Sequence, residues 1–367
     1  MLLTVEDHRR AARRYLPRFV FDYVDGAAED EVCLARNRRD LDAITLAPHV
    51  LRDTRDTTTS VEIFGTRWNC PLAVAPTGLN GLLRPRGDAL IAAAAAAVGV
   101  PFVQSTASNM RVEDVRRAAP GGEHWLQLYV MEDRGIAEQL VERAAAAGTR
   151  VLVLTVDVPV SGNRERDLRN GFKLPMRATP ALAWDLATHP RWALGMAFGG
   201  APRFVNLVAD PTARLSASAQ AALLARTMDR GLTWDSLRWL RSIWRGPLVL
   251  KGLLQPDDAR RAAGEGIDGI IVSNHGGRQF DASPSAISAL PAIVDATGDR
   301  LPVFMDSGVR RGVDIARALA LGAKAVFIGR PVLYALAANG QRGVEALLRN
   351  LMLEYERSLV LLGSLRP

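Results

Sequence analysis

The stretch PLAVAPTGLNGLLRPRGDALIAAAAAAVGVPFVQST, residues 71–106, decides the fold of this chain. An apolar run at 71–78 closes in a Pro-Thr-Gly turn, and an alanine-rich segment at 87–98 ends at a glycine. A second apolar run follows at 101–106. Short apolar runs bounded by turn residues are typical of buried strands, and the longer segment between them is typical of a helix. The stretch therefore predicts one strand–helix–strand unit.

The same unit recurs along the chain, at the spacing of roughly 25 to 30 residues that is expected of a βα repeat. The predicted strands are 71–78, 101–106, 125–130, 151–157, 247–252, 270–274, 302–306 and 325–330, and the predicted helices between them are 87–98, 112–119, 135–147, 256–264, 285–296 and 312–321. Strands that are apolar along their whole length are buried on both faces. The pattern therefore predicts a closed parallel (β/α)8 TIM barrel of the α/β class rather than an open sheet.

Two segments do not follow the repeat. Residues 1–70 are expected to form N-terminal helices and a cap, in which residues 46–64 form either a short hairpin or a lid over one barrel end. Residues 158–245 form a long insert after the fourth strand, with an amphipathic helix expected at 227–244. Loops of this length are usually functional. We expect residues 1–367 to fold as a single domain.

Composition narrows the class of protein. Of the 367 residues, 48% are hydrophobic and 23% charged, as in globular proteins. Cys33 and Cys70 show no metal or disulfide spacing, which suits a reducing cytosol. We expect no metal site, no export signal and no membrane span. The net charge is +7, but the arginines are scattered among acids and no nucleic-acid motif is present, so we expect a cytoplasmic protein that does not bind nucleic acid.

The stretch SNHGGRQFD, residues 273–281, carries the first candidate site residues. It follows a predicted strand, and in parallel α/β proteins ligands bind where the strands end. His275 could act as a base and Arg278 could clamp a carboxylate. The alternative is a glycine-rich turn whose histidine is merely hydrogen-bonded.

Polar residues follow every predicted strand, and all of these positions face one mouth of the barrel. Such a complete set is what a large cofactor together with a substrate requires. The residues are Thr77 and Gly78, Ser105, Gln127 and Tyr129, Thr155 and Asp157, Lys251, Ser273, His275 and Arg278, Asp306, Ser307 and Gly308, and Gly329 and Arg330.

The loops after the last two strands usually hold phosphate in TIM barrels. Here Gly308 and Gly329 allow close approach of a ligand, and Arg310 and Arg330 supply guanidinium groups that fork onto phosphate oxygens. Lys251 ends the fifth predicted strand. It could stabilise negative charge on an electron-accepting ring, or it could form a Schiff base.

These motifs resemble those of the FMN-dependent L-2-hydroxy-acid oxidase and dehydrogenase family, and the resemblance covers essentially the whole chain. It is carried by FDYVDGA at 21–27, APTG at 75–78, QLY at 127–129, LTVD at 154–157, VLKG at 249–252 and SNHGGRQFD at 273–281. Within the family, the membrane-associated (S)-mandelate dehydrogenases are the most similar in PTGLNG at 76–81, STASNM at 105–110, RERDL at 164–168 and HPRW at 189–192.

The resemblance implies that the chain binds FMN and oxidises an L-2-hydroxy acid to the 2-oxo acid. His275 would take the α-proton, or the hydroxyl proton if hydride moves to flavin N5, and Asp157 would stabilise the resulting imidazolium. Tyr129 would bond the substrate hydroxyl. The residues implied to bind the substrate carboxylate are Arg278, Tyr23 and Arg164. The residues implied to bind FMN are Ala75, Pro76, Thr77, Ser105, Gln127, Thr155, Lys251, Ser273, Asp306, Ser307, Gly308, Arg310, Gly329 and Arg330.

Two further positions bear on the substrate and the electron acceptor. Ala107 stands where small-acid oxidases of the family often carry tryptophan, and Gly78 stands where many of its oxidases carry alanine. Both favour a bulky, aromatic substrate and an acceptor such as a quinone rather than oxygen. The resemblance also implies a homotetramer.

Several alternatives stay open. The insert holds eight Lys or Arg against four Asp or Glu at 159–215, together with Trp184, Trp192 and Phe198. Residues 176–215 could form a lid, a subunit contact or a peripheral patch on the inner face of the cell membrane. Other functions are those of an oxygen-using oxidase, an L-lactate dehydrogenase, an FMN barrel like isopentenyl diphosphate isomerase, and a barrel without catalytic activity.

Overall fold

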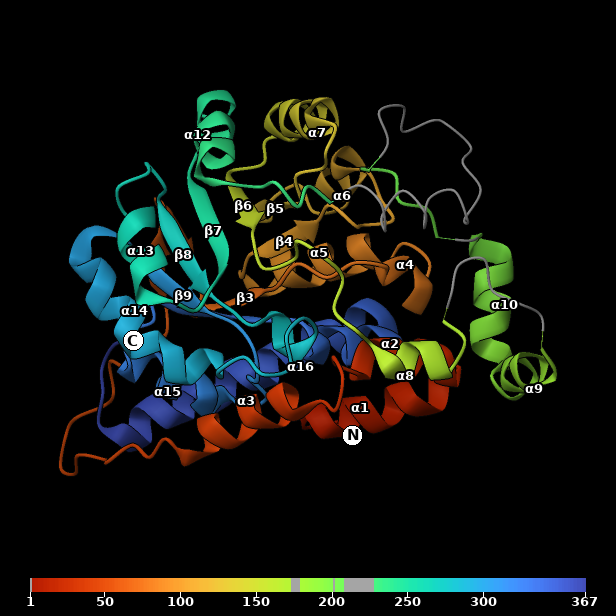
Figure 1. Ribbon diagram of the computed structural model, residues 1–367. Coiled ribbons are helices and arrows are strands. Elements are labelled where there is room, and N and C mark those ends of the chain that lie inside the picture. The colour runs from red at the N-terminus through yellow and green to blue at the C-terminus, as the bar shows by residue number, and fades with distance from the viewer. Residues whose placement is uncertain (1, 173–178, 201, 208–227) are drawn as a thin grey trace.

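The computed structural model describes residues 2–172, 179–200, 202–207 and 228–367. Eight parallel strands close into a barrel in the order β10-β3-β4-β5-β6-β7-β8-β9, which confirms the predicted TIM barrel (Figure 1). The strands are β3 Leu72–Val74, β4 Phe102–Ser105, β5 His124–Leu128, β6 Val151–Thr155, β7 Leu248–Leu253, β8 Gly269–Val272, β9 Val303–Met305 and β10 Ala325–Ile328. Each lies within or next to a predicted strand, because continuous apolar runs mark strands that are buried on both faces.

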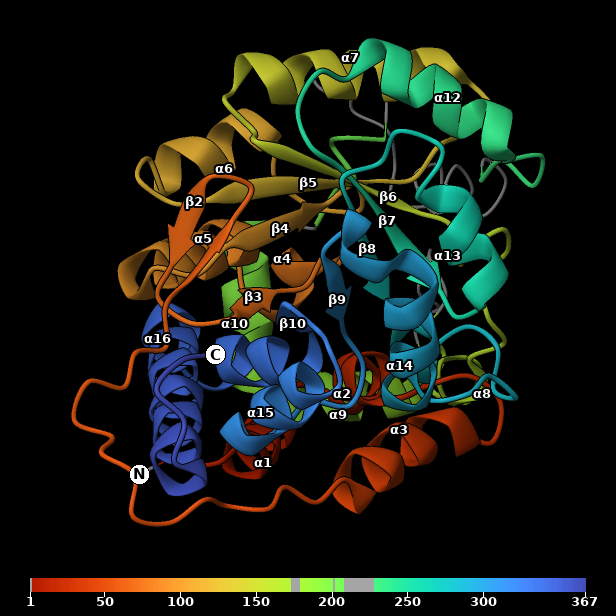
Figure 2. The same ribbon diagram turned by 90° about the vertical axis from the view of Figure 1, so that its left-hand side faces the viewer.

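Helices surround the barrel and bury the outward-facing side chains of the strands in one large hydrophobic core (Figure 2). They are α5 Gly87–Val98, α6 Val112–Ala118, α7 Arg134–Ala146, α13 Pro256–Ala262, α14 Ala286–Thr297, α15 Gly312–Ala320 and α16 Arg330–Leu362. The first six agree with the predicted helices to within a few residues. The last was not predicted, and its backbone leaves the helical conformation at Asn339 and Gly340.

A hairpin closes the end of the barrel where the strands begin. It consists of β1 (Val61–Ile63) and β2 (Thr66–Trp68), which pair antiparallel. The Trp68 ring packs edge-on against Trp125 inside the barrel, with 5.5 Å between the ring centroids. Each prediction for residues 46–64 holds in part, because the hairpin starts only at residue 61 and also covers one end of the barrel. The opposite end is left for a ligand.

The N-terminal segment lies along the outside of the barrel. It contains α1 (Val5–Tyr15), α2 (Arg18–Asp25) and α3 (Val32–Ala43). The side chain of Thr4 caps α1, and Pro17 begins the next helix. Helix α2 carries Tyr23 to the open mouth of the barrel.

The insert contributes α8 (Glu165–Arg169), α9 (Pro180–Thr188), α10 (Pro190–Gly199) and α12 (Trp234–Ile243). Short helix α4 (Asn80–Leu83) belongs to the loop after β3. No helix in the described ranges is long and apolar enough to cross a membrane. Parts of the expected segment 176–215 lie outside the described residues.

The predicted helix at 227–244 is wrong at its start. Residue 227 lies outside the described residues, and Met228 forms an isolated bridge with Met131. The chain then turns, because the backbone N–H of Gly231 donates to the Asp229 carboxylate over 2.7 Å. Thr233 forms a capping box with Ser236 and starts the helix only at Trp234.

Candidate active site

A cavity of about 720 Å³ lies at the mouth of the barrel where the strands end. It is lined from all sides, by α2, by the loops after most strands, and by the insert. The predicted site residues that line it are Tyr23, Ala75, Pro76, Thr77, Gly78, Ser105, Ala107, Tyr129, Arg164, Lys251, His275, Arg278, Asp306, Ser307, Gly308, Arg310, Gly329 and Arg330. The other predicted residues, Asp157, Gln127, Thr155 and Ser273, are not among its lining and lie behind it.

His275 and Asp157 form the most direct chemical contact of the site. His275 Nδ1 lies 3.0 Å from Asp157 Oδ1 and 3.2 Å from Oδ2. Burial raises the pKa of Asp157, but the nearby His275 and Lys251 outweigh it, so that the pKa stays below its usual value. The carboxylate therefore holds one ring nitrogen and leaves Nε2 for the cavity.

Two backbone features place this contact. Gly252 has a φ of +110°, and a Cβ there would lie 2.6 Å from Asp157 Cβ, so only glycine lets Asp157 approach. His275 itself has a φ of 57°, which is rare for a side chain of its size. Its amide donates to Ser273 Oγ over 3.0 Å, and the amide of Gly276 donates to Ser307 Oγ over 3.0 Å. The SNHGGRQ turn is thus held by its own serine and by the loop after β9.

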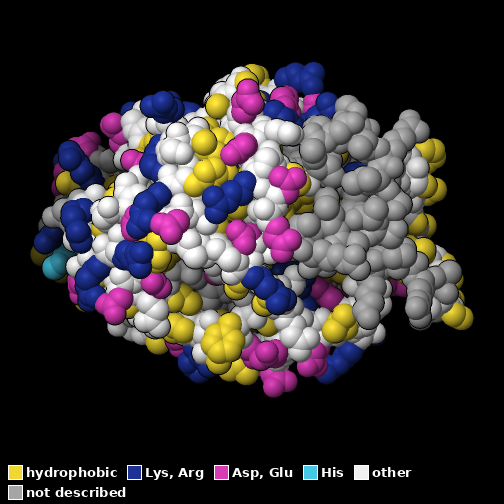
Figure 3. All heavy atoms as spheres, turned by 45° about the horizontal axis from the view of Figure 1, so that its top comes forward, with side chains coloured by type: hydrophobic (Ala, Val, Ile, Leu, Met, Phe, Trp, Pro, Cys, Tyr) yellow, Lys and Arg dark blue, Asp and Glu magenta, His cyan; other side chains and the backbone are white. Residues whose placement is uncertain are grey.

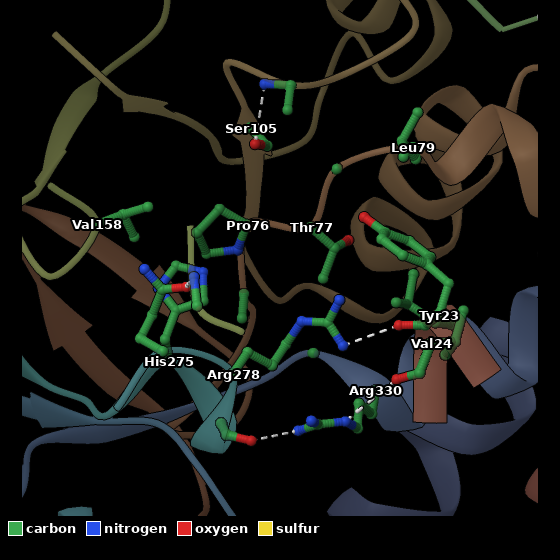
Figure 4. Close-up of a pocket in the computed structure, with 18 of the residues that line it drawn as sticks. Tyr23, Val24, Pro76, Thr77, Leu79, Ser105, Val158, His275, Arg278 and Arg330 are labelled. Atoms are coloured by element: carbon green, nitrogen blue, oxygen red, sulfur yellow. Dashed lines mark hydrogen bonds between the residues drawn. The ribbon is translucent and has the colours of Figure 1, made fainter. Parts of the chain in front are cut away.

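Arg278 follows the same turn as His275 at the cavity and reaches toward Tyr23 (Figure 4). Its Nη1 donates to the carbonyls of Tyr23 and Gly26, each over 2.8 Å, and its guanidinium stands 5.1 Å from the Tyr23 ring centroid. Burial lowers the pKa of Arg278, and the neighbouring Arg164 lowers it further. Two cations close together at a cavity wall attract an anion such as a carboxylate.

Lys251 is buried and paired. Its Nζ donates to Ser273 Oγ over 2.9 Å and lies 3.2 Å from Asp306 Oδ2. Burial lowers the pKa of Lys251, but the charges of Asp306 and Asp157 outweigh this effect and raise it. A lysine kept protonated suits charge stabilisation and not Schiff-base formation, which needs the free amine.

The wall beside Lys251 tests whether FMN fits. Gln127 Oε1 accepts a hydrogen bond from Ser105 Oγ over 3.0 Å. In contrast, Gln127 Nε2 and Thr155 Oγ1 are buried without a hydrogen-bond partner among the described residues. Unpaired buried polar atoms are rare in native structures because they raise the free energy of the fold. A ligand that forms hydrogen bonds with these two atoms would remove that free-energy cost. A flat ring with polar edges, such as isoalloxazine, fits this wall.

The loops after β9 and β10 were predicted to hold the phosphate. Arg310 and Arg330 both line the cavity and are half-buried there. Arg330 donates to the carbonyls of Val24, Gly276 and Gly26, and its remaining N–H donors stay available. Burial and the nearby Arg278 lower the pKa of Arg330 to about 9. A Cβ on Gly329 would meet its nearest protein atom, Thr77 Cγ2, only at 3.5 Å. No neighbouring protein group therefore requires glycine here, and its small size leaves space for a ligand.

One wall of the cavity is apolar and was largely missed in the sequence. Leu79, Met131, Phe204 and Leu207 form a small core that packs against Tyr23, Ala107, Tyr129 and Phe172. The Phe172 ring stacks on Tyr23 with 4.7 Å between centroids. Phe172 and Phe204 belong to the irregular insert, where no periodicity shows which side a residue faces. Only their aromatic character could have marked them.

Gln279 is a further residue that sequence reasoning left out. Its Nε2 donates to the carbonyls of Asp157 and Val160, and its Oε1 accepts from the amide of Gly162 over 3.1 Å. It thereby ties the loop after β6 to the SNHGGRQ turn. The signal was present, since Gln279 is the last residue of that motif.

Comparison with known proteins agrees with this geometry. Residues 12–366 match the family model of FMN-dependent dehydrogenases. The chain is 46% identical over 362 residues to (S)-mandelate dehydrogenase of Pseudomonas putida, covering 99% of this chain and 91% of that protein. It is 47% identical over 358 residues to L-lactate dehydrogenase of Caulobacter vibrioides, covering 97% and 93%.

Solved structures give the same answer. The crystal structure of the monotopic membrane protein (S)-mandelate dehydrogenase superposes with a TM-score of 0.95 at 45% identity and covers 100% of this chain and 96% of that chain. Mandelate oxidase with (S)-4-hydroxymandelic acid gives a TM-score of 0.86 at 39% identity, covering 99% and 96%. The predicted family and the predicted cofactor FMN are confirmed. The chain belongs to the FMN-dependent dehydrogenase family.

Proposed function

We propose that this enzyme oxidises a mandelate-like L-2-hydroxy acid, with a bulky aromatic side chain, to the 2-oxo acid. The observation that carries the proposal is the His275–Asp157 contact at 3.0 Å, with Arg278 lining the same cavity. A hydroxy acid needs a base for its proton and a cation for its carboxylate, and both line this one cavity.

The carboxylate is held first. Arg278 and Arg164 both line the cavity, and Arg278 is fixed by the carbonyls of Tyr23 and Gly26. A planar guanidinium can bind both carboxylate oxygens and so orient the carbon that reacts. The Tyr23 hydroxyl is available as a further donor to the same group.

His275 Nε2 then takes the proton from the substrate, and Asp157 stabilises the imidazolium through Nδ1. Tyr129 orients the substrate hydroxyl. Burial raises the pKa of Tyr129, and the charge of Asp157 raises it further, so the phenol stays protonated and can donate. His275, Asp157 and Tyr129 have the same roles whether the proton leaves from Cα or from the hydroxyl.

FMN, when bound, supplies the acceptor for two electrons. Lys251, Ser105, Gln127 and Thr155 would surround its ring system, with the protonated lysine opposite any negative charge on it. The residues that would hold the ribityl chain and phosphate are Asp306, Ser307, Gly308, Arg310, Gly329 and Arg330. Ala75, Pro76 and Thr77 would support the ring from the end of β3, and Ser273 would act through Lys251 and the His275 amide.

The pocket beside Ala107 supports a large substrate side chain. Ala107 packs against the apolar core of the cavity wall, and a Cβ on Gly78 would lie only 2.9 Å from Ala107 Cβ. Gly78 thus packs directly against Ala107, and both small residues line the cavity, where a larger side chain would take up space. L-Lactate is the alternative substrate, because the similar Caulobacter vibrioides protein is an L-lactate dehydrogenase.

Turnover on (S)-mandelate, L-lactate and glycolate tests the proposal. We expect kcat/KM for mandelate to exceed that for glycolate by about tenfold or more, since pocket filling is worth that much. Ala107→Trp should lower kcat/KM for mandelate far more than for glycolate, whereas Ala107→Gly should keep the mandelate preference. A clear preference of the native enzyme for glycolate would contradict the proposal, and colourless protein that takes up no FMN would favour a barrel without activity.

The proposed acceptor is a quinone, and the proposed location is the inner face of the cell membrane. Trp184 and Phe198 are 74% and 90% exposed on α9 and α10, an unusual exposure for large apolar side chains. We propose that these helices make peripheral membrane contact, and that residues 1–367 fold as one domain and assemble as a homotetramer.

The electron acceptor is tested by mixing the reduced enzyme with a short-chain quinone or with oxygen. We expect the quinone to reoxidise the flavin faster.

A further inference from the structure

A second cavity, of about 520 Å³, lies outside the active site, between the N-terminal helices and the insert. It is lined mainly by cations, among them Arg9, Arg13, Arg18, Arg166 and His189. None of these residues contributes to the catalytic cavity. A cavity that is lined mainly by cations and is separate from the catalytic cavity favours the binding of an anion.

The two carboxylates of this cavity are already engaged. Asp25 accepts from Arg9 Nε over 2.6 Å and from Arg166 Nη1 over 3.0 Å, and the hydroxyl of Tyr334 donates to it over 2.8 Å. Asp22 accepts a hydrogen bond from the side-chain amide of Asn170. Asp22 also pairs with Arg18, yet the lining holds four arginines against two aspartates, so an excess of positive charge remains.

Arg13 and Arg18 are the most loosely held of these four arginines. Arg13 has no carboxylate within ion-pair distance among the described residues, and it lies four positions after Arg9 on the same face of α1. Arg18 forms an ion pair with Asp22 over 3.4 Å, but its side chain is 77% exposed, and so exposed a pair contributes little. Two guanidinium groups with free donors at one cavity can fork onto the oxygens of a phosphate.

The cavity adjoins the apolar helices of the insert. The backbone N–H of Arg18 donates to the Asp185 carboxylate of α9 over 2.7 Å, and His189 lies where α9 meets α10. Trp192 fixes α10 to the barrel by donating to the Leu82 carbonyl over 2.8 Å. Leu194 on this helix is 58% exposed, like its neighbours Trp184 and Phe198.

Figure 3 shows hydrophobic side chains along the edge of the molecule on the side where Figure 1 places α9 and α10. A cationic cavity next to an exposed apolar surface matches the two parts of a phospholipid. The acyl region needs the apolar helices and the phosphate needs the arginines.

We propose that this second cavity binds the phosphodiester headgroup of an anionic phospholipid whose acyl chains contact α9 and α10. The inference rests on the proposed membrane contact and adds to it a lipid class and a headgroup site. Arg13 and Arg18 are the binding residues, while Arg9 and Arg166 are held by Asp25 and shape the cavity.

Vesicle flotation at low salt tests the site, with vesicles of phosphatidylcholine alone and of an equimolar mixture with phosphatidylglycerol. The FMN-loaded enzyme should float with the mixture much more than with phosphatidylcholine alone. The double variant Arg13→Gln and Arg18→Gln should bind the mixture about thirtyfold more weakly, since each basic residue near an anionic surface contributes about a fivefold change.

The matched control removes the same charge elsewhere. Arg14 and Arg52 are exposed and line neither cavity, and the segment that carries Arg52 lies at the other end of the molecule from α10 (Figure 1). Arg14→Gln with Arg52→Gln should therefore bind the mixed vesicles nearly as the native enzyme does. Both double variants should keep their FMN and their kcat with soluble substrate, which shows that they are folded.

Each failure has its own meaning. Equal binding to both vesicle types, or an equal loss of binding in the two double variants, would overturn the headgroup site. The membrane contact would still hold if the variant Trp184→Ser with Phe198→Ser no longer binds the vesicles. No flotation with either vesicle would overturn both ideas. If inorganic phosphate raises the Tm of the native enzyme but not of the Arg13→Gln, Arg18→Gln variant, and vesicles do not bind, the cavity takes a soluble anion and the lipid occupant is wrong.

Discussion

At the scale of single residues, the reactivity of the site depends on which nitrogen of His275 is free. Asp157 holds Nδ1 at 3.0 Å and remains ionised because His275 and Lys251 lower its pKa against the effect of burial. An ionised carboxylate on Nδ1 fixes the tautomer with a free Nε2 and stabilises the imidazolium that forms there.

Asp157→Asn should therefore slow anaerobic reduction of the bound FMN by (S)-mandelate by about 10² to 10⁴-fold, the usual range for losing effective acid–base catalysis. Stopped-flow absorbance measures this rate, and substrate affinity should change little because Arg278 and Arg164 remain. Asp257→Asn, on an exposed carboxylate whose side chain is 90% accessible, is the control. A rate for Asp157→Asn within a few-fold of the native rate would remove Asp157 from the mechanism.

The sequence indicated the ends of the strands but not these contacts. The polar residue after each apolar run could be placed at the mouth, because all parallel strands of a barrel end on one side. The contact between His275 and Asp157 joins residues far apart in the chain, and only the family resemblance suggested it. The places of Gln127, Thr155 and Ser273 behind the cavity wall depend on side-chain packing that no local pattern records.

At the scale of elements, the end of α2 joins the N-terminal helices to the barrel mouth. Asp25 at this end is bonded by Arg9, Arg166 and Tyr334, from α1, the insert and α16. Burial raises its pKa, but the hydrogen bonds from Arg9 and Tyr334 outweigh this effect and lower it to about 2.

Since this folded pKa lies below the usual value of 3.8, the ionised Asp25 stabilises the fold above about pH 4. This contribution is lost as the pH falls toward 2. Asp25→Asn should lower the free energy of unfolding by about 2 kcal/mol at pH 7, and the difference from the native protein should shrink by pH 3.

Denaturation by urea at the two pH values measures the difference, with Asp53→Asn on an exposed loop carboxylate as the control. A difference that is the same at pH 7 and pH 3 would show that Asp25 does not act through its charge.

Element positions were predicted well where periodicity is strong and poorly where it is interrupted. The helix at 87–98 was predicted with both bounds right, because a glycine stops it and apolar strands flank it. The start of α12 was wrong because an Asp-Arg-Gly turn precedes the Thr233 cap. The long helix α16 was not predicted, and Asn339 and Gly340 interrupt its pattern.

At the scale of the whole molecule, one end of the barrel is closed and the other end holds the catalytic cavity. The β1–β2 hairpin and aromatic residues such as Trp68 and Trp125 fill the closed end. The open end receives α2 and the insert, so the cavity is bounded by segments that lie far apart in the chain (Figure 1). The barrel followed from the repeat, whereas the arrangement of the insert did not, because its residues have no regular period.

The proposed chemistry depends on His275 taking a proton from a 2-hydroxy acid held by Arg278 beside FMN. The most direct test mixes the FMN-loaded enzyme with (S)-mandelate without oxygen and follows flavin absorbance, in the native protein and in His275→Gln. We expect rapid bleaching of the native enzyme, and in His275→Gln a rate lower by at least about 10³-fold with the substrate still bound. Native enzyme that no 2-hydroxy acid bleaches would rule out hydroxy-acid oxidation, and a His275→Gln variant that bleaches at the native rate would show that His275 is not the base.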